Sequence, residues 1–164
     1  MSNIANYNRT NAVNYAGIWA LKRNPRYLDF SNMGGDCTNF ISQCLYVGSN
    51  IMNYTNIYGW YYNNANHRSA SWTGVEYLYN FLISNKKAGV FATKTTIHNI
   101  MLGDIIQLGN QSHFYHSLIV TGIGSKPDYD NVLVSTHSDD FHLRPLYTYS
   151  YSAIRFLHIE GVYI

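Results

Sequence analysis

The chain has 164 residues and a formal net charge of +2, and 46% of its residues are hydrophobic. This length fits one domain, expected to span residues 1–164, and the hydrophobic fraction excludes long disorder. The 11 basic residues are scattered along the chain, and no stretch approaches the ~20 apolar residues of a membrane span, so we expect a monomer that binds neither nucleic acid nor membrane.

Residues 1–20 show no charged segment followed by an apolar run, so no secretory signal peptide is visible. The location of the protein therefore stays open. We expect an extracellular or cell-wall-associated location if the chain is excised from a longer secreted protein, and a cytoplasmic one otherwise.

Segments with helical spacing of apolar residues come first, and strand-like segments follow them. The expected helices span residues 11–22, 37–48 and 73–84, and the second begins after Asp36 and closes at Gly48. Residues 50–73 are rich in Asn and Tyr and are expected to be loop. Strands are predicted at 104–108, 115–123 and 131–136, with a last one near 154–158 or 161–164. This order indicates an α+β fold.

Cys37 and Cys44 lie in the same predicted helix. Their α-carbons would be ~10 Å apart there, which exceeds the ~7 Å that a disulfide can bridge. We therefore expect free thiols. Cys44 lies two turns along the apolar stripe and is predicted to be an inert core residue, whereas Cys37 lies in the first turn.

Cys37 has the surroundings of a nucleophile. A thiol in the first turn of a helix is near the positive end of the helix dipole, which favours the thiolate. Gly34 and Gly35 have no β-carbon, so a substrate can approach the backbone closely. The free N–H of Cys37 can then face a developing oxyanion. The alternative is a buried structural cysteine in a helix that Asp36 caps.

A nucleophilic thiol needs a base, and His116 is the best placed of the seven histidines. It begins an apolar strand, from which a rigid sheet could present it to a helix start. A hairpin about Pro127 would bring position 116 opposite about position 139, with His137 one diagonal step away. Either His137 or Asp139 could orient His116, because a shift of the strand register exchanges the two.

The spacing of the histidines does not favour a metal site. The chain has no HExxH and no CxxC motif. His116, His137 and Asp139 would form a ligand set, but such a site leaves Cys37 without a role. We therefore expect neither a metal nor another cofactor.

The chain contains 16 tyrosines, whose rings combine a large apolar surface with a polar hydroxyl. They would suit a wet, extended cleft for a polar polymer, although a compositional bias explains the count equally well. Trp60 and Tyr61 are predicted to wall such a cleft, with Asp36 as a third substrate-binding residue. The neighbouring Tyr62 and Trp72 could do the same. The alternative is that these rings cover the core between the helices and the sheet, which suits Trp72 better than Trp60.

Several motifs occur in the order found in one known family. They are Gly-Gly-Asp-Cys-Thr-Asn-Phe-Ile-Ser-Gln-Cys at 34–44, Gly-Trp-Tyr-Tyr at 59–62, Ser-Trp at 71–72, Gly-Asp-Ile-Ile at 103–106, His-Ser-Leu-Ile-Val at 116–120 and Thr-His-Ser-Asp at 136–139. With these motifs the chain resembles the putative bacterial amidase-domain family from about Tyr7 to beyond Pro145. That family is similar to the NlpC/P60 and CHAP groups of papain-like cysteine peptidases and amidases.

The resemblance implies a papain-like, NlpC/P60-like fold in which N-terminal helices pack on an antiparallel sheet. It implies that Cys37 is the nucleophile and His116 the base, and it favours His137 over Asp139 as the third catalytic residue. The implied reaction is hydrolysis of an amide bond through a thioester, and the implied partner is peptidoglycan or a peptide substrate. One departure is that no Gln precedes Cys37 to act as an oxyanion donor.

Two other functions fit the same residues. An acyltransferase would release the thioester to an amine instead of water. A catalytically silent binding module would hold a polymer in the aromatic cleft and would need no reactive thiol.

Overall fold

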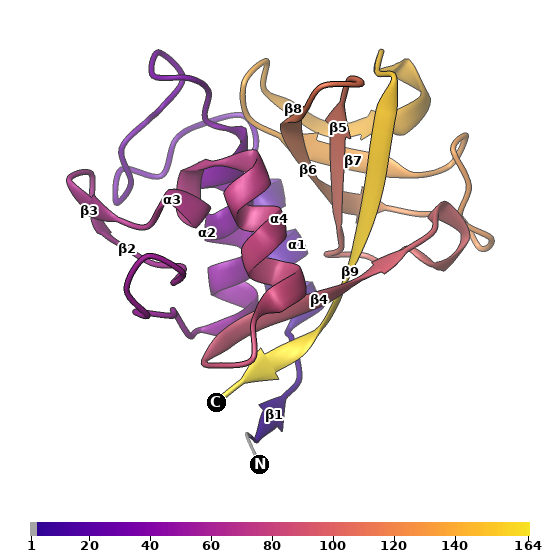
Figure 1. Cartoon of the computed structure of the whole chain (residues 1–164). Helices are drawn as coiled ribbons and strands as arrows, with labels where there is room; N and C mark the ends of the chain where they lie inside the picture. Colours follow the sequence, from indigo (N-terminus) through magenta and orange to yellow (C-terminus); the bar gives the residue numbers. More distant parts are fainter. Residues whose placement is uncertain (1–2) are drawn as a thin grey trace.

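The computed structural model describes residues 3–164 and confirms the α+β order of the elements (Figure 1). The helices are α1 (Arg9–Trp19), α2 (Cys37–Ser49), α3 (Ala70–Thr73) and α4 (Val75–Ser84). The strands are β1 (Ile4–Ala5), β2 (Tyr62–Asn64), β3 (His67–Arg68), β4 (Gly89–Thr95), β5 (Ile105–Gly109), β6 (Phe114–Gly122), β7 (Leu133–Thr136), β8 (Phe141–Pro145) and β9 (Ala153–Tyr163). Among residues 3–164, no helix has the length and apolar character needed to cross a membrane.

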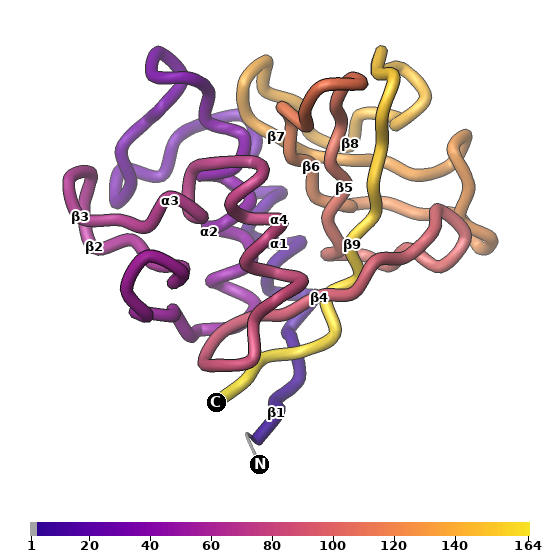
Figure 2. Tube along the Cα trace, in the orientation of Figure 1, coloured from indigo at the N-terminus to yellow at the C-terminus, as the bar shows by residue number. Residues whose placement is uncertain are grey.

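One antiparallel sheet of seven strands forms the body of the fold. Its order is β1-β9-β5-β6-β7-β8, and β4 also pairs with β9. The long strand β9 therefore connects β1 and β4 at one end to β5 at the other. In β1, Ile4 lies opposite Tyr163 of β9, so the first and last strands lie side by side (Figure 2). A separate hairpin is formed by β2 and β3.

Side chains that alternate along β5 and β6 divide the apolar residues between two clusters. The paired residues Ile105 and Ile119 belong to the cluster that also contains Phe40 of α2. Their neighbours Ile106 and Leu118, also paired, belong to a second cluster. The helices thus cover one face of the sheet, and the strands bury apolar side chains on both faces.

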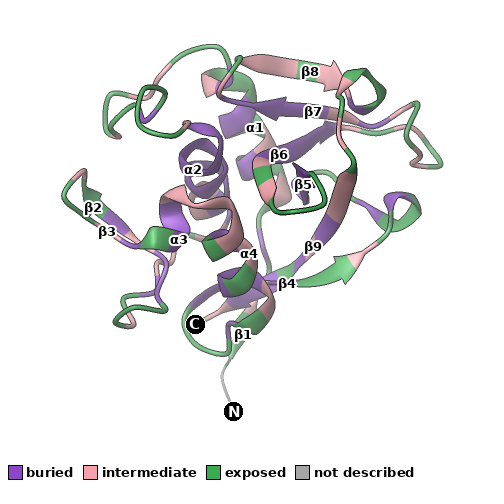
Figure 3. Ribbon diagram, turned by 45° about the horizontal axis from the view of Figure 1, so that its top comes forward, coloured by how far each residue is buried: buried purple, intermediate pink, exposed green. Residues whose placement is uncertain are grey.

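The central helix α2 is buried along most of its length, whereas α4 carries exposed residues on its outer side (Figure 3). Gly48, which was predicted to close α2, lies inside the helix, and the left-handed residue that follows the last turn is Asn50, with a φ of 57°. The reason for a glycine at position 48 is packing, because a β-carbon there would overlap the ring of Tyr7.

Most predicted elements are confirmed to within a few residues, and the differences have physical causes. The first helix ends at Trp19 instead of residue 22, and Leu21 is 65% exposed. The two candidate last strands are parts of β9. Strands β4 and β8 were not predicted, because their Gly, Lys, Arg and Pro residues lower strand propensity and pairing with distant strands decides their conformation. Strand β1 was not predicted either, and the segment 50–73, expected to be loop, contains the short elements β2, β3 and α3.

Candidate active site

Cys37 begins α2 and faces the start of β6. It is a free cysteine and is 6% exposed. The backbone N–H groups of Ser117 and Thr38 stabilise the charged form of its sulfur. The hydroxyls of Thr38 and Ser117 hydrogen bond at 3.0 Å. Because Ser117 directly follows His116, the fold brings the segments of the predicted nucleophile and the predicted base into contact.

Burial raises the pKa of the Cys37 thiol above its ordinary value, and the N–H groups of Ser117 and Thr38 only partly oppose this effect. The sequence predicted that the helix dipole would favour the thiolate. In the structure desolvation is the larger effect, so the resting group is a neutral thiol. Cys44 is fully buried in the core, as predicted, and burial raises its pKa well above the ordinary value.

The start of α2 leaves a backbone donor beside the thiol. The first helical hydrogen bond runs from the N–H of Phe40 to the carbonyl of Asp36 at 3.0 Å. Within residues 3–164, the N–H of Cys37 has no acceptor. It therefore lies free at the positive end of the helix dipole. Gly34 and Gly35 approach it with φ values of +97° and +112°, which glycine adopts without strain.

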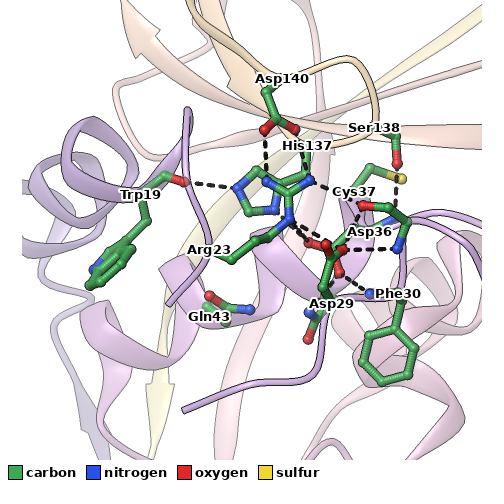
Figure 4. Close-up of polar contacts among 12 residues, drawn as sticks. Trp19, Arg23, Asp29, Phe30, Asp36, Cys37, Gln43, His137, Ser138 and Asp140 are labelled. Carbon is green, nitrogen blue, oxygen red and sulfur yellow. Dashed lines mark hydrogen bonds and ion pairs between the residues drawn. The ribbon is translucent and has the colours of Figure 1, made fainter. Parts of the chain in front are cut away.

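The side chain of Asp36 is fully buried. Figure 4 shows its polar contacts at the start of α2. Its Oδ1 accepts hydrogen bonds from the N–H of Phe30 at 2.8 Å and from Nδ2 of Asn39 at 2.9 Å. Its Oδ2 lies 2.5 Å from Nδ1 of His137, and its backbone N–H donates to Oγ of Ser138 at 2.8 Å. The prediction that Asp36 binds substrate is therefore wrong, because its side chain is inaccessible to solvent and both carboxyl oxygens already contact protein groups.

His137 is 1% exposed, and both of its ring nitrogens face acceptors. Nδ1 faces Oδ2 of Asp36, and Nε2 lies 2.8 Å from the carbonyl oxygen of Trp19. A carbonyl oxygen only accepts, so Nε2 carries a proton, and Nδ1 shares a hydrogen bond with the carboxyl group of Asp36. The ring also stacks on Phe40 with centroids 4.2 Å apart. Contrary to the prediction, His137 does not orient His116 here, because its two ring nitrogens contact Asp36 and Trp19.

Arg23 completes this buried cluster and was not singled out from the sequence. Its Nη1 and Nη2 donate to the two carboxylate oxygens of Asp140 at 2.7 and 3.0 Å. Its Nε lies 3.2 Å from Asp29 and 3.4 Å from Asp36. A bidentate guanidinium–carboxylate pair fixes the relative orientation of the two groups as well as their distance. Arg23 therefore anchors the loop before the thiol to the turn between β7 and β8.

His116 is half-buried in β6, on the strand next to the thiol. Burial lowers the pKa of its imidazole to about 4; the negative charge of Asp139 opposes this shift and the positive charge of Arg144 adds to it. At neutral pH the ring is therefore neutral and can accept a proton. Its centroid lies 6.0 Å from that of Tyr149. Within residues 3–164 the imidazole makes no hydrogen bond, so Asp139 acts on it through charge alone.

The two aromatic residues predicted to wall a cleft differ in exposure. Trp60 is fully buried, donates from Nε1 to Oγ of Ser42 at 3.0 Å and stacks on Trp72 with centroids 5.0 Å apart. The prediction for Trp60 is therefore wrong, because a ring inside the core cannot touch a substrate. Tyr61 is half-buried and stacks on Tyr54 at the surface.

The metal alternative considered from the sequence is not assembled. In the described part of the chain, residues 3–164, no three His, Cys, Asp or Glu side chains converge as metal ligands. His137 could not join such a set with His116 in this arrangement, because Asp36 and Trp19 occupy its ring nitrogens.

These features define an α+β protein in which a free cysteine starts a buried helix beside an antiparallel sheet, with a neutral histidine on the adjoining strand. The chain belongs to the family described as "Putative amidase domain", whose sequence model matches residues 6–159. That description is of a hydrolase that acts on amide bonds.

One curated relative is "Uncharacterized protein YhbB" of Bacillus subtilis (strain 168), to which the chain is similar at 35% identity over 143 residues. The match covers 84% of this chain and 43% of the relative, so the chain spans less than half of that protein's length. No solved structure matches the chain.

Proposed function

We propose that the protein is a papain-like cysteine amidase in which Cys37 is the nucleophile and His116 the base. The observation that carries the proposal is the position of Cys37 at the first turn of α2, where the next residue, Thr38, hydrogen bonds to Ser117, the residue that follows His116. The family description supports amide hydrolysis in general. A free thiol, a neutral imidazole and an unpaired backbone N–H are the three groups that acyl transfer to a cysteine requires.

The reaction starts from a neutral thiol and a neutral imidazole. His116 accepts the thiol proton while the sulfur of Cys37 forms a bond to the amide carbonyl carbon, and the oxyanion is held by the N–H of Cys37. The C–N bond then breaks, and the imidazolium of His116 gives its proton to the leaving amine. Water, deprotonated by His116, attacks the thioester carbon; the C–S bond breaks, the acid is released, and His116 returns the proton to the sulfur of Cys37.

The imidazole of His116 must turn toward the thiol for this reaction. In the free protein its nearest aromatic neighbour is Tyr149, and no hydrogen bond holds it in place within residues 3–164. Catalytic hydrogen bonds are often long or absent until substrate is bound. The negative charge of Asp139 stabilises the imidazolium that forms during attack.

Asp36 and His137 act on the thiol through the backbone in this proposal. Asp36 directly precedes Cys37, and it is held at two points, its backbone N–H by Ser138 and its carboxyl group by His137. A nucleophile misplaced by about 1 Å loses roughly 10²-fold in rate. These residues are therefore positioning residues and do not contact the reacting atoms.

We further propose that the substrate is a peptide amide of cell-wall peptidoglycan. A digest of purified peptidoglycan, followed by mass spectrometry of the products, tests the activity and the bond at once. The wild-type protein should release peptides with a new amino group and a new carboxylate. Cys37→Ala should lower the rate by roughly 10³-fold or more while the protein still folds. Undiminished cleavage by that variant contradicts the mechanism.

One observation favours a second candidate, a polymer-binding module without catalysis. The thiol of Cys37 is 6% exposed and its pKa is raised, which does not favour a reactive thiolate in the free protein. Such a module would bind peptidoglycan equally well in the wild-type and Cys37→Ala proteins and would release no product. The same digest therefore separates the two functions.

A further inference from the structure

Residues of the loop between α1 and α2 and of the β2–β3 hairpin line a cavity. These segments lie on the side of the molecule away from β5–β9 (Figure 1). The volume of the cavity is about 440 Å³, within the ~300–1,000 Å³ of small-molecule sites. Its walls include Arg26, Tyr27, Tyr46, Tyr54, Tyr62 and Asn63. None of these residues belongs to the candidate active site.

The cavity offers hydrogen-bond donors that the protein does not use. Within residues 3–164, the guanidinium of Arg26 makes neither an ion pair nor a hydrogen bond, and only its backbone N–H is bonded, to Asn24. The hydroxyls of Tyr27 and Tyr46 likewise have no protein partner in this range. No acidic residue lines the cavity. The site is therefore positive and rich in donors, which favours a ligand with acceptor oxygens and a negative charge.

The aromatic walls are held in place before any ligand binds. The ring of Tyr27 stacks on Trp72 with centroids 6.0 Å apart and an interplanar angle of 17°. Tyr62 is 8% exposed, and its hydroxyl accepts a hydrogen bond from the N–H of Leu28 at 2.9 Å. Fixed rings with polar edges match a sugar, which has apolar ring faces and a rim of hydroxyls. A preformed site loses little entropy when it binds.

One wall of the cavity is connected to the candidate active site. Leu28, whose N–H is bonded to Tyr62, accepts a hydrogen bond at its carbonyl oxygen from Nδ2 of Asn39 at 3.0 Å. The same Nδ2 donates to Asp36, the residue before Cys37, at 2.9 Å. A polymer that fills the cavity would therefore contact a wall that is hydrogen bonded, through Leu28 and Asn39, to the loop before Cys37.

We propose that this cavity is a saccharide subsite that binds a sugar residue carrying a carboxylate. Arg26 pairs with the carboxylate, and the rings of Tyr27 and Tyr62 contact the sugar faces. The saccharide chemistry follows from the cavity itself. Only the identity of the polymer, the glycan strand of peptidoglycan, rests on the proposed function.

The test uses the full chain with Cys37→Ala, which removes the nucleophile, and follows backbone amide signals by NMR during titration. The probes are N-acetylmuramic acid, which carries a carboxylate, and N-acetylglucosamine, which does not. Arg26→Gln removes the charge in the cavity. Lys22→Gln is the matched control, because it removes the same charge from a residue over the ring of Trp19, outside the cavity.

We expect N-acetylmuramic acid to shift the signals of Tyr27, Tyr62 and Asn63, and Arg26→Gln to weaken its binding by roughly tenfold, the size of a charge-assisted hydrogen bond. N-acetylglucosamine should bind more weakly and should not respond to Arg26→Gln, and Lys22→Gln should change neither affinity.

Three results would overturn the proposal. They are no shift at the cavity with millimolar sugar, equal effects of Arg26→Gln and Lys22→Gln, and binding of the dipeptide L-alanyl-D-glutamate at the cavity in place of the sugar. Failure of the proposed function is seen separately, as absence of turnover in the wild-type protein.

Discussion

The buried pair of Asp36 and His137 gives the sharpest test of how the loop before the thiol is held. Asp36→Asn keeps the shape of the side chain but replaces an acceptor oxygen of the carboxyl group, the atom that contacts Nδ1 of His137, with an amide NH2. Both groups are buried, with exposed fractions of 0% and 1%. Breaking one partner of a buried, hydrogen-bonded pair costs about 3–5 kcal/mol, because the other charge is left uncompensated.

For a domain of this size each kcal/mol corresponds to roughly 2–4 °C in melting temperature, so Asp36→Asn should lower it by about 6–20 °C. The matched control is Asp29→Asn, which makes the same change in the same cluster at a carboxylate that is 46% exposed. Exposed pairs contribute about 0–1 kcal/mol, so this control should melt within a few degrees of the wild type. Urea unfolding followed by circular dichroism gives the free energies directly.

A double-mutant cycle makes the test specific to the pair. His137→Gln in the Asp36→Asn background also removes the ring that Asp36→Asn leaves without its carboxyl partner, so the double variant should be more stable than the sum of the single losses predicts. A coupling of about 0.5–3 kcal/mol is expected for residues in one network. Additive losses, or a loss of less than about 1 kcal/mol for Asp36→Asn, refute the assigned pairing.

Three further predictions concern the candidate site. Since burial lowers the pKa of His116 to about 4 and the reaction needs the neutral ring, kcat/KM should be constant near neutrality and fall as the pH drops through about 4. Asp139→Asn removes a charge that raises this pKa, so the fall in kcat/KM should move to lower pH in that variant. A fall near the ordinary pKa of histidine argues against His116 as the base. Cys44→Ala should keep the rate of peptidoglycan cleavage, since this thiol is buried in the core, and loss of activity in a folded variant would show that the wrong cysteine was chosen. Gly35→Ala and Gly34→Ala both place a β-carbon at positive φ, at a cost of about 1–3 kcal/mol each. Only at Gly35 would the new β-carbon lie 3.2 Å from Oγ of Ser138. The rate of cleavage should therefore fall further in Gly35→Ala, and equal losses would contradict a role for that contact.

The parts of the fold that follow from local pattern could be predicted from the sequence. The apolar stripe from Cys37 to Cys44 places α2 correctly, and the short apolar segments bounded by glycines give β5 and β6. Strand β8 could not be predicted in this way, because Arg144 and Pro145 oppose a strand and pairing with β7 decides the outcome.

In the candidate site, too, residues marked by a local sequence pattern could be predicted, whereas residues placed by long-range contacts could not. A cysteine after two glycines and an aspartate marks a helix start locally, so Cys37 could be found. The partner of Asp36 lies 101 residues away in the sequence, and Arg23 and Asp140 are 117 residues apart. No short-range pattern encodes such contacts, so the role of Asp36 was assigned wrongly and Arg23 was missed.

The central claim is that Cys37 carries the acyl group during amide hydrolysis. Acid quenching of the wild-type protein during turnover of peptidoglycan fragments, followed by intact mass measurement and peptide mapping, tests this claim most directly. We expect an acyl adduct on Cys37, none on Cys44, and no adduct in the Cys37→Ala protein. An adduct on another residue, or turnover that persists in Cys37→Ala, would contradict it.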